Sequence, residues 1–359
     1  MTGAVRPVHA RIVRQEYAEE NVSQMLDALP AAQRPASDGA RGVPPVDPAA
    51  YDEPGPGLYV YRLRRGDDEH TGVVGDVSAE AFVDGRVRGH EAVQPDRVAG
   101  LVDHFTSAAV RSELVALLHR SGPAVQAAIA ETVGQEPLIQ FTGPDAWEQT
   151  VWRVPEAASE VLSDELSSDV HYIADGHHRV AASLSVWERA DRPADAGLMC
   201  VIYPFDGLRL LAFHRRVTGP IATDSLLALL GPSFELSEIA HPDDANGCFG
   251  VYADGRWHDA SFTGERLPGS SGLDIAILNE QVLDPLLSTV TSSGPRLEIA
   301  SALSSLDEMT KACDQDGGVL FALRPPSLDQ LTEVADRGEV MPPKTTYFDP
   351  KPYAGIFLR

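Results

Sequence analysis

Residues 172–179 combine phosphate-binding residue types at the point where an apolar run becomes a helical one. The stretch reads Tyr-Ile-Ala-Asp-Gly-His-His-Arg. The first N–H groups of a helix have no intrahelical partner and lie at the positive end of its dipole, so a helix that starts here favours an anion. We expect Asp175 at the N-cap position, and Gly176 to allow a tight turn and the close approach of a ligand. The pattern predicts a phosphate site whose side chains are His177, His178 and Arg179.

The same residues also have a purely structural explanation. Asp-Gly is a common turn, and a surface His-His-Arg triplet is usually solvated, so the stretch alone leaves both interpretations open. A metal site is disfavoured. His171 and Asp175 lie about 13 Å apart on an extended strand at roughly 3.3 Å per residue, and adjacent helical residues such as His177 and His178 point about 100° apart.

A carboxylate suited to proton transfer follows the turn at Asp84 and Gly85. The sequence there is Arg88-Gly89-His90-Glu91. Glu91 could take the proton of an acceptor hydroxyl if it lies within hydrogen-bond reach of that group, with His90 beside it at the substrate. A lone surface glutamate is more often only solvated, so this assignment needs tertiary evidence.

Residues 341–351 form a proline-rich strap near the C-terminus that carries Lys344 and Lys351. Proline fixes φ and removes a donor, so the strap is predicted to be rigid and non-helical. We expect it to place Lys344 on a phosphate. A tail that is simply docked on its own domain is the alternative, because chain ends need tying down.

Hydrophobic periodicity predicts a mixed α+β chain around a central core that carries the site. A strand over 57–63 and its partner over 71–77 form a hairpin, and 95–134 holds two helices broken near residues 121–123. The other expected strands are 151–154, 171–174, 198–203, 208–215 and 319–323. The other expected helices begin near Glu156 or span 180–189, 273–287 and 327–337. Residues 31–56 are rich in Pro, Ala, Asp and Gly and are predicted to be a linker.

Charge and cysteine content exclude several classes of protein. The 359 residues include 53 acidic and 29 basic side chains, a net charge of -24, so a nucleic-acid partner is not expected. A nucleotide site would have to be locally basic. The three cysteines Cys200, Cys248 and Cys313 are widely spaced, which predicts neither disulfides nor a zinc knuckle. With no apolar signal core and no membrane-length apolar run, we expect a cytoplasmic protein.

Four motifs together resemble a bacterial and archaeal family of unknown function, DUF1015. In chain order they occupy residues 58–62, 89–91, 172–179 and 341–351. That family resembles the ParB/sulfiredoxin-like superfamily, which includes kinases that phosphorylate free L-serine with ADP or ATP. The resemblance implies a ParB/sulfiredoxin-like core over 57–217, an N-terminal segment and linker over 1–56, and a C-terminal α+β domain over 218–359 whose strap returns toward the site.

The resemblance also implies residue roles. The Asp-Gly-His-His-Arg corner would hold the nucleotide phosphates through Asp175, Gly176, His177, His178 and Arg179, and Glu91 would be the base for the acceptor hydroxyl. The N-terminal region and the segment 103–118 depart from the family pattern, which leaves the acceptor open.

The sequence-based hypothesis is a kinase that transfers a phosphoryl group from ATP or ADP, with Mg²⁺ carried by the nucleotide, to the hydroxyl of free L-serine or a related amino acid. Phosphoryl transfer needs positioning and charge stabilisation more than covalent chemistry, and the residues above are of suitable types. Two alternatives remain: a non-catalytic nucleotide-binding regulatory protein, and a phosphate-ester or nucleotide hydrolase that uses the same corner. The oligomeric state is left open.

Overall fold

The structure, a computed structural model, describes residues 3–32, 47–107, 111–288, 294–301 and 303–359, and the chain forms two compact units. The first unit is Met1–Arg209 with Pro350–Arg359, and the second is Leu210–Asp349. The division differs from the expected boundaries after residues 56 and 217. The N-terminal segment joins the core because Val5 pairs with Val77, and the last residues return to the first unit because Phe357 pairs with Ile12.

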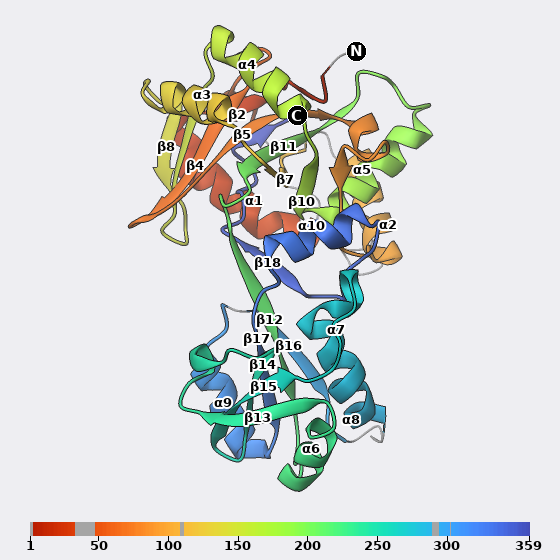
Figure 1. Cartoon of the computed structure of the whole chain (residues 1–359). Coiled ribbons are helices and arrows are strands. Elements are labelled where there is room, and N and C mark those ends of the chain that lie inside the picture. Colours follow the sequence, from red (N-terminus) through yellow and green to blue (C-terminus); the bar gives the residue numbers. More distant parts are fainter. Residues whose placement is uncertain (1–2, 33–46, 108–110, 289–293, 302) are drawn as a thin grey trace. The chain divides into compact units, whose positions relative to one another are not determined.

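Both units mix helices and sheets, so the expected α+β class is confirmed (Figure 1). The strands of the first unit are β1 (Val5–Arg6), β2 (Arg11–Val13), β3 (Tyr51–Asp52), β4 (Tyr59–Arg65), β5 (Asp68–Ser78), β6 (Val87–Arg88), β7 (Val115–His119), β8 (Ile139–Thr142), β9 (Glu148–Arg153), β10 (His171–Asp175), β11 (Gly197–Pro204) and β19 (Phe357–Leu358). Its helices are α1 (Ala18–Ala32), α2 (Pro95–Ser107), α3 (Pro123–Val133), α4 (Glu156–Ser167) and α5 (His177–Arg189).

A nine-stranded sheet forms the core of the first unit. Its order is β6-β10-β7-β11-β5-β4-β9-β8, with β1 added beside β5. Most neighbours are antiparallel, but β11 runs parallel to β7 and β10 runs parallel to β6, with His171 opposite Val87 and Tyr172 opposite Arg88. Parallel strands end at the same edge of a sheet, so the segments that follow β6 and β10 leave the sheet side by side.

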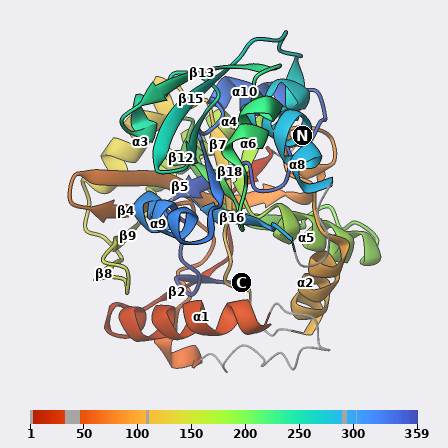
Figure 2. The same cartoon turned by 90° about the horizontal axis from the view of Figure 1, so that it is seen from below.

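Two helix pairs cover strands of this sheet. Helices α3 and α4 pack on each other, and α3 contacts β4 and β9. Helices α2 and α5 also pack on each other, and they lie side by side in Figure 2. The α2–α5 contact is apolar, formed by Leu101, Val102 and Phe105 against Ala182. This packing holds α5, and with it the predicted phosphate corner, against the edge of the sheet.

One predicted helix is wrong. Residues 95–134 contain α2 and α3, as expected, but the end of the predicted first helix is the strand β7. All five residues of β7 are buried, and it pairs with β10 on one side and β11 on the other. A short apolar run buried on both faces has no alternation, so periodicity does not separate it from a buried helix.

The other predicted elements of the first unit are confirmed. β4 and β5 form the expected hairpin, with Gly66 at positive φ in the turn, and β9, α4, β10, α5 and β11 lie where they were predicted. Of the predicted linker 31–56, residues 33–46 lie outside the described residues. The remainder includes the strand β3, which pairs with β2.

The second unit is built on a seven-stranded sheet of order β13-β15-β14-β17-β12-β16, in which these neighbours are antiparallel, with β18 beside β12. Its strands are β12 (Arg209–Val217), which begins at the unit boundary, β13 (Phe234–Ile239), β14 (Phe249–Ala253), β15 (Arg256–Phe262), β16 (Leu297–Ser301), β17 (Val319–Leu323) and β18 (Thr346–Asp349). Its helices are α6 (Thr223–Leu230), α7 (Asp274–Leu278), α8 (Asp284–Ser288), α9 (Leu306–Asp316) and α10 (Leu328–Asp336). The expected elements at 208–215, 273–287, 319–323 and 327–337 are all present.

Candidate functional site

The predicted corner lies at the junction of β10 and α5. Strand β10 ends at Asp175, Gly176 turns the chain with φ 105°, and α5 begins at His177. A positive φ of this size favours glycine, which explains the residue at this position. The N-cap residue is Gly176, so the expectation that Asp175 caps the helix is wrong. As the last residue of the strand, Asp175 directs its carboxylate to other partners.

Those partners are two cations. Arg179, one turn into α5, donates to one carboxylate oxygen of Asp175, and Lys351 donates to the other. Arg179 also donates to the carbonyl of Leu114, so its guanidinium is held in place between α5 and the segment before β7. Burial raises the pKa of Asp175, but attraction from Arg179 and Lys351 outweighs it and holds the pKa below its usual value. Asp175 is therefore an ionised, neutralised carboxylate at the base of the corner.

The element containing Gly89, His90 and Glu91 meets the same corner. It follows β6, which ends beside β10 because the two strands are parallel. The backbone N–H of His90 donates to His177 Nε2 over 3.3 Å, and the two imidazole rings lie edge to face with centroids 4.6 Å apart. A Cβ at Gly89 would come within 3.1 Å of the His177 ring, so only glycine fits without a shift. Two motifs more than 80 residues apart in the chain thus form one site.

The hydrogen bond to His177 determines its tautomer. Nε2 accepts from the His90 N–H, so in the neutral ring Nδ1 carries the proton. Nδ1 lies 3.6 Å from Oε2 of Glu91, whose side chain is 35% exposed while that of His177 is 5% exposed. Burial lowers the pKa of His177 to about 4, with Asp175 opposing the shift. His177 is therefore neutral near pH 7, and its donor side lies toward a carboxylate that is open to solvent.

His178 contacts the end of the segment that joins β6 to α2. Its Nε2 accepts from the backbone N–H of Gln94 over 3.0 Å, immediately before α2 begins. Burial and the neighbouring His177 hold the pKa of His90 well below its ordinary value. The segment between β6 and α2 is therefore joined to the first turn of α5 through both histidines.

The two strap lysines lie in different units. Lys344 lies in the second unit, with Nζ 5.3 Å from the centre of the Phe213 ring. The expectation that Lys344 reaches the phosphate stays a prediction. The strap lysine at the corner is Lys351, which pairs with Asp175. No role was predicted for it from the sequence, although it lies in the same strap. The signal was present, because Pro350 precedes it and two lysines share the strap, but the sequence did not show which lysine meets Asp175.

The corner has the groups to hold a nucleotide polyphosphate. The first N–H groups of α5, with His178, Arg179 and Lys351 nearby, supply donors and positive charge. Within the described part of the chain, no three His, Cys, Asp or Glu side chains are grouped closely enough to hold a metal ion. None of the helices in the described residues is long and apolar enough to span a membrane.

Comparison with known proteins identifies the family. The model of the family described as protein of unknown function (DUF1015) matches residues 50–285. The chain belongs to this family. The family predicted from the motifs is thus confirmed, and the match contains the corner and Glu91. No curated protein matches this DUF1015 chain.

Solved structures resemble the chain only distantly. A free serine kinase mutant in complex with ADP has 14% sequence identity and a TM-score of 0.42, and the match covers 77% of this DUF1015 chain and 87% of that chain. A conserved hypothetical protein from Pyrococcus furiosus has 14% identity and a TM-score of 0.39, covering 80% and 93%. SbnI with a C-terminal truncation, from Staphylococcus aureus, has 10% identity and a TM-score of 0.41, covering 78% and 85%. The ParB/sulfiredoxin-like relationship stays a prediction.

Proposed function

We propose that this protein is a kinase that transfers a phosphoryl group from ATP or ADP to the hydroxyl of free L-serine or a related amino acid. The observation that supports it most is the meeting of Glu91 with the first turn of α5 around the buried His177. One side of this site offers donors and cations, and the other offers a carboxylate accessible to solvent. Phosphoryl transfer needs both, on opposite sides of the transferred group.

The nucleotide phosphates would bind at the N-terminus of α5. The first N–H groups of the helix, Gly176 and His178 surround this point, and Arg179 and Lys351 add charge. Asp175 orients both cations by pairing with each of them. Magnesium would arrive with the nucleotide, because the described residues contain no group of three or more His, Cys, Asp or Glu side chains that could hold a metal ion and Mg²⁺ commonly combines few protein ligands with phosphate oxygens.

The acceptor would bind beside His90 and Glu91. Glu91 takes the proton of the acceptor hydroxyl while the hydroxyl oxygen forms a bond to the terminal phosphorus and the bond to the leaving ADP or AMP breaks. His177 directs its Nδ1 proton to the same side, where Nδ1 lies 3.6 Å from Glu91 Oε2. Because His177 is neutral near pH 7, it faces Glu91 as a neutral N–H group and not as the cation of an ion pair.

A product screen tests the proposal. Purified protein is incubated with Mg²⁺ and ATP or ADP in the presence of each of the common amino acids, and mass spectrometry measures a phosphate-sized gain on the amino acid. We expect a phosphorylated hydroxy amino acid. Free phosphate without an amino-acid product would make the protein a hydrolase, and nucleotide binding without either product would make it a regulatory binding protein. The variant Glu91→Gln is the negative control, and Glu188→Gln, a surface carboxylate paired with Arg192, is the matched control.

A further inference from the structure

A second cavity lies in the first unit beside α5. Its volume is about 400 Å³, and one face of α5 lines it, from Arg179 through Ser183 and Trp187 to Ala190. The remaining wall includes residues from α2, β7 and the segment before it, β11 and the segment before it, Ala79 and the residue Arg359. This volume is within the range of small-molecule sites, roughly 300–1,000 Å³. The kinase proposal above assigns no ligand to this cavity.

The wall of the cavity carries three arginines and one carboxylate, namely Arg111, Arg179, Arg359 and Glu113. Glu113 accepts from the Ser112 N–H and lies 3.6 Å from His104. Burial raises its pKa, but these contacts outweigh burial and hold the pKa at about 2. Glu113 is therefore ionised, and it offsets part of the positive charge of the three arginines.

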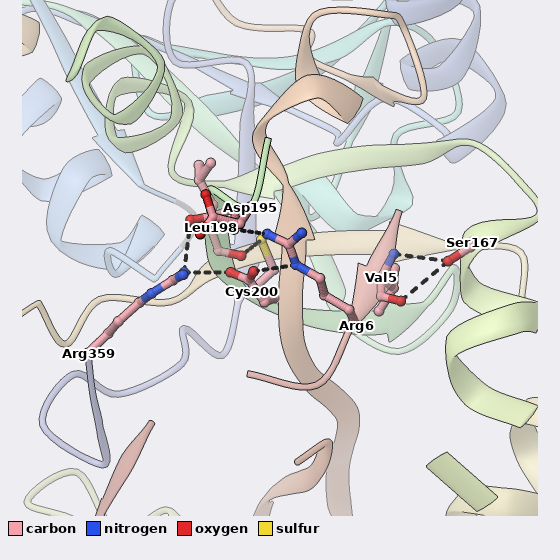
Figure 3. A network of polar contacts seen from close by, with 9 residues as sticks. Val5, Arg6, Ser167, Asp195, Leu198, Cys200 and Arg359 are labelled. Carbon is pink, nitrogen blue, oxygen red and sulfur yellow. Dashed lines mark hydrogen bonds and ion pairs between the residues drawn. The ribbon is translucent and has the colours of Figure 1, made fainter. Parts of the chain in front are cut away.

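Two of the arginines are already neutralised. Arg179 pairs with Asp175, as described above. Arg359 pairs with Asp76, which also binds Arg6 over 2.8 Å, and Arg359 donates to the carbonyl of Gly197 over 2.9 Å (Figure 3). This network holds the Arg359 side chain at the cavity, because Asp76 is buried and anchored from two sides.

Arg111 differs from the other two. It donates to the carbonyl of Phe105 over 3.0 Å and lies over the Phe105 ring at 4.8 Å, but within the described residues it forms no ion pair. Its backbone exchanges two hydrogen bonds with that of Arg359, of 2.9 and 2.8 Å, which places the two residues directly opposite each other. Like charges directly opposite are destabilising. Burial and Arg359 both lower the pKa of Arg111, and attraction from Glu113 opposes the shift without cancelling it.

We propose that this cavity binds a small organic anion, a carboxylate or a phosphate monoester with an apolar body. The anionic group lies at Arg111 and Arg359, where it contacts a half-buried guanidinium that forms no ion pair within the described residues and that Glu113 attracts from a greater distance. The apolar body packs on Phe105, Val186 and Trp187, whose indole N–H already donates to Pro193 over 3.0 Å and needs no ligand partner. The inference goes beyond the kinase proposal and does not depend on it.

Ligand-observed NMR and calorimetry with four probes test the site. Benzoate and phenyl phosphate carry both the charge and the apolar body, benzamide carries the body alone, and inorganic phosphate carries the charge alone. We expect the two aromatic anions to bind at least about tenfold more tightly than benzamide, because the charged group is bonded to arginine. The stronger of the two identifies the head group. Equal binding of benzamide and benzoate would overturn the proposal.

Variants locate the binding. Arg111→Gln should weaken the aromatic anions about tenfold or more, whereas Arg189→Gln, which changes an exposed arginine at the end of α5, should leave them unchanged. Ser183→Phe should fill the cavity and abolish binding of the aromatic anions. If Ser183→Phe does not fold, Ala190→Trp fills the cavity from the exposed end of α5. Unchanged affinity in Arg111→Gln and in a folded filling variant would overturn the site. Simple competition between ADP and benzoate would assign the cavity to the nucleotide and overturn its role as a second site.

Discussion

The two ends of strand β10 each carry a buried histidine pair. At its start His171 lies against His119, with ring centroids 4.8 Å apart, and just beyond its end His177 lies against His90 at 4.6 Å. Burial lowers the pKa at both ends, to about 3 for His171 and about 4 for His177. By residue type and burial the two pairs are nearly equivalent.

Their surroundings separate them. The ring nitrogens of His119 and His171 have no hydrogen-bond partner in the part of the chain that the structure describes. At the other end, His177 accepts from the loop backbone and has a carboxylate 3.6 Å from its Nδ1, at the first turn of a helix. The half-buried carboxylate and the start of α5 beside His177 therefore distinguish the second pair from the first, and the kinase proposal depends on them.

The largest effect is expected from removing the proposed base beside the second histidine pair, His90 and His177. Glu91→Gln removes the base and keeps the shape of the side chain, so turnover should fall by a factor of about 10²–10⁴ while ADP affinity changes by less than about twofold. Steady-state kinetics on the product identified by the amino-acid screen, with calorimetry of ADP binding, measure both. Normal turnover with impaired nucleotide binding would instead make Glu91 a structural residue. Glu188→Gln should change neither quantity.

The next effect concerns the phosphate side of the corner. Arg179→Ala should weaken ADP binding roughly 10- to 100-fold, because a hydrogen bond to a charged group is lost from the site. Calorimetry measures the affinity, and the melting temperature reports whether loss of the contacts to Asp175 and Leu114 also unfolds the unit. Arg189→Ala is the control on the same helix. Unchanged ADP affinity in a folded Arg179→Ala protein would place the nucleotide elsewhere.

The first histidine pair should affect stability rather than activity. Burial and His119 lower the pKa of His171 from 6.5 to about 3, so between these pH values the unfolded chain binds a proton that the folded chain does not. The free energy of unfolding should therefore fall as pH falls below 6.5, by up to about 1.4 kcal/mol per pH unit for this residue. His171→Leu should make this decline shallower.

Urea unfolding at pH 7, 6 and 5 measures how the free energy of unfolding declines with pH. In a Trp257→Phe background, the remaining tryptophans, Trp147, Trp152 and Trp187, all lie in the first unit and report its unfolding. His9→Leu, an exposed histidine, is the control. An equally steep decline in His171→Leu would show that this histidine does not control acid stability.

The smallest expected effect compares the two strap lysines. Lys351→Met removes one of the two cations on Asp175, and because the lysine side chain is 45% exposed we expect only about a two- to fivefold loss of ADP affinity. Lys344→Met tests the prediction made from the strap. A loss of ADP affinity of similar size would support Lys344 as a phosphate ligand. Wild-type ADP affinity would show that the prediction for Lys344 is wrong.

Several elements could be predicted because their signals are local. Alternation predicted the β4–β5 hairpin, and an apolar run followed by Asp-Gly predicted the junction of β10 and α5. The strand β7 could not be predicted, because a run buried on both faces carries no periodic signal. The capping role of Asp175 was predicted wrongly for a related reason: an aspartate before a helix can cap it or pair elsewhere, and the choice depends on Arg179 and Lys351.

The sequence by itself determined the family, from four motifs in one order, and the mixed class of the fold and the turn from β10 into α5, which depend on residues that are neighbours in the chain. Only the tertiary structure decided which distant residues share the site. Parallel pairing of β6 with β10 brings Glu91 to His177, and the return of the last residues to the first unit brings Lys351 to Asp175 and Arg359 to Arg111. Contacts of this kind depend on strand order and chain path, which no local spacing of residues records.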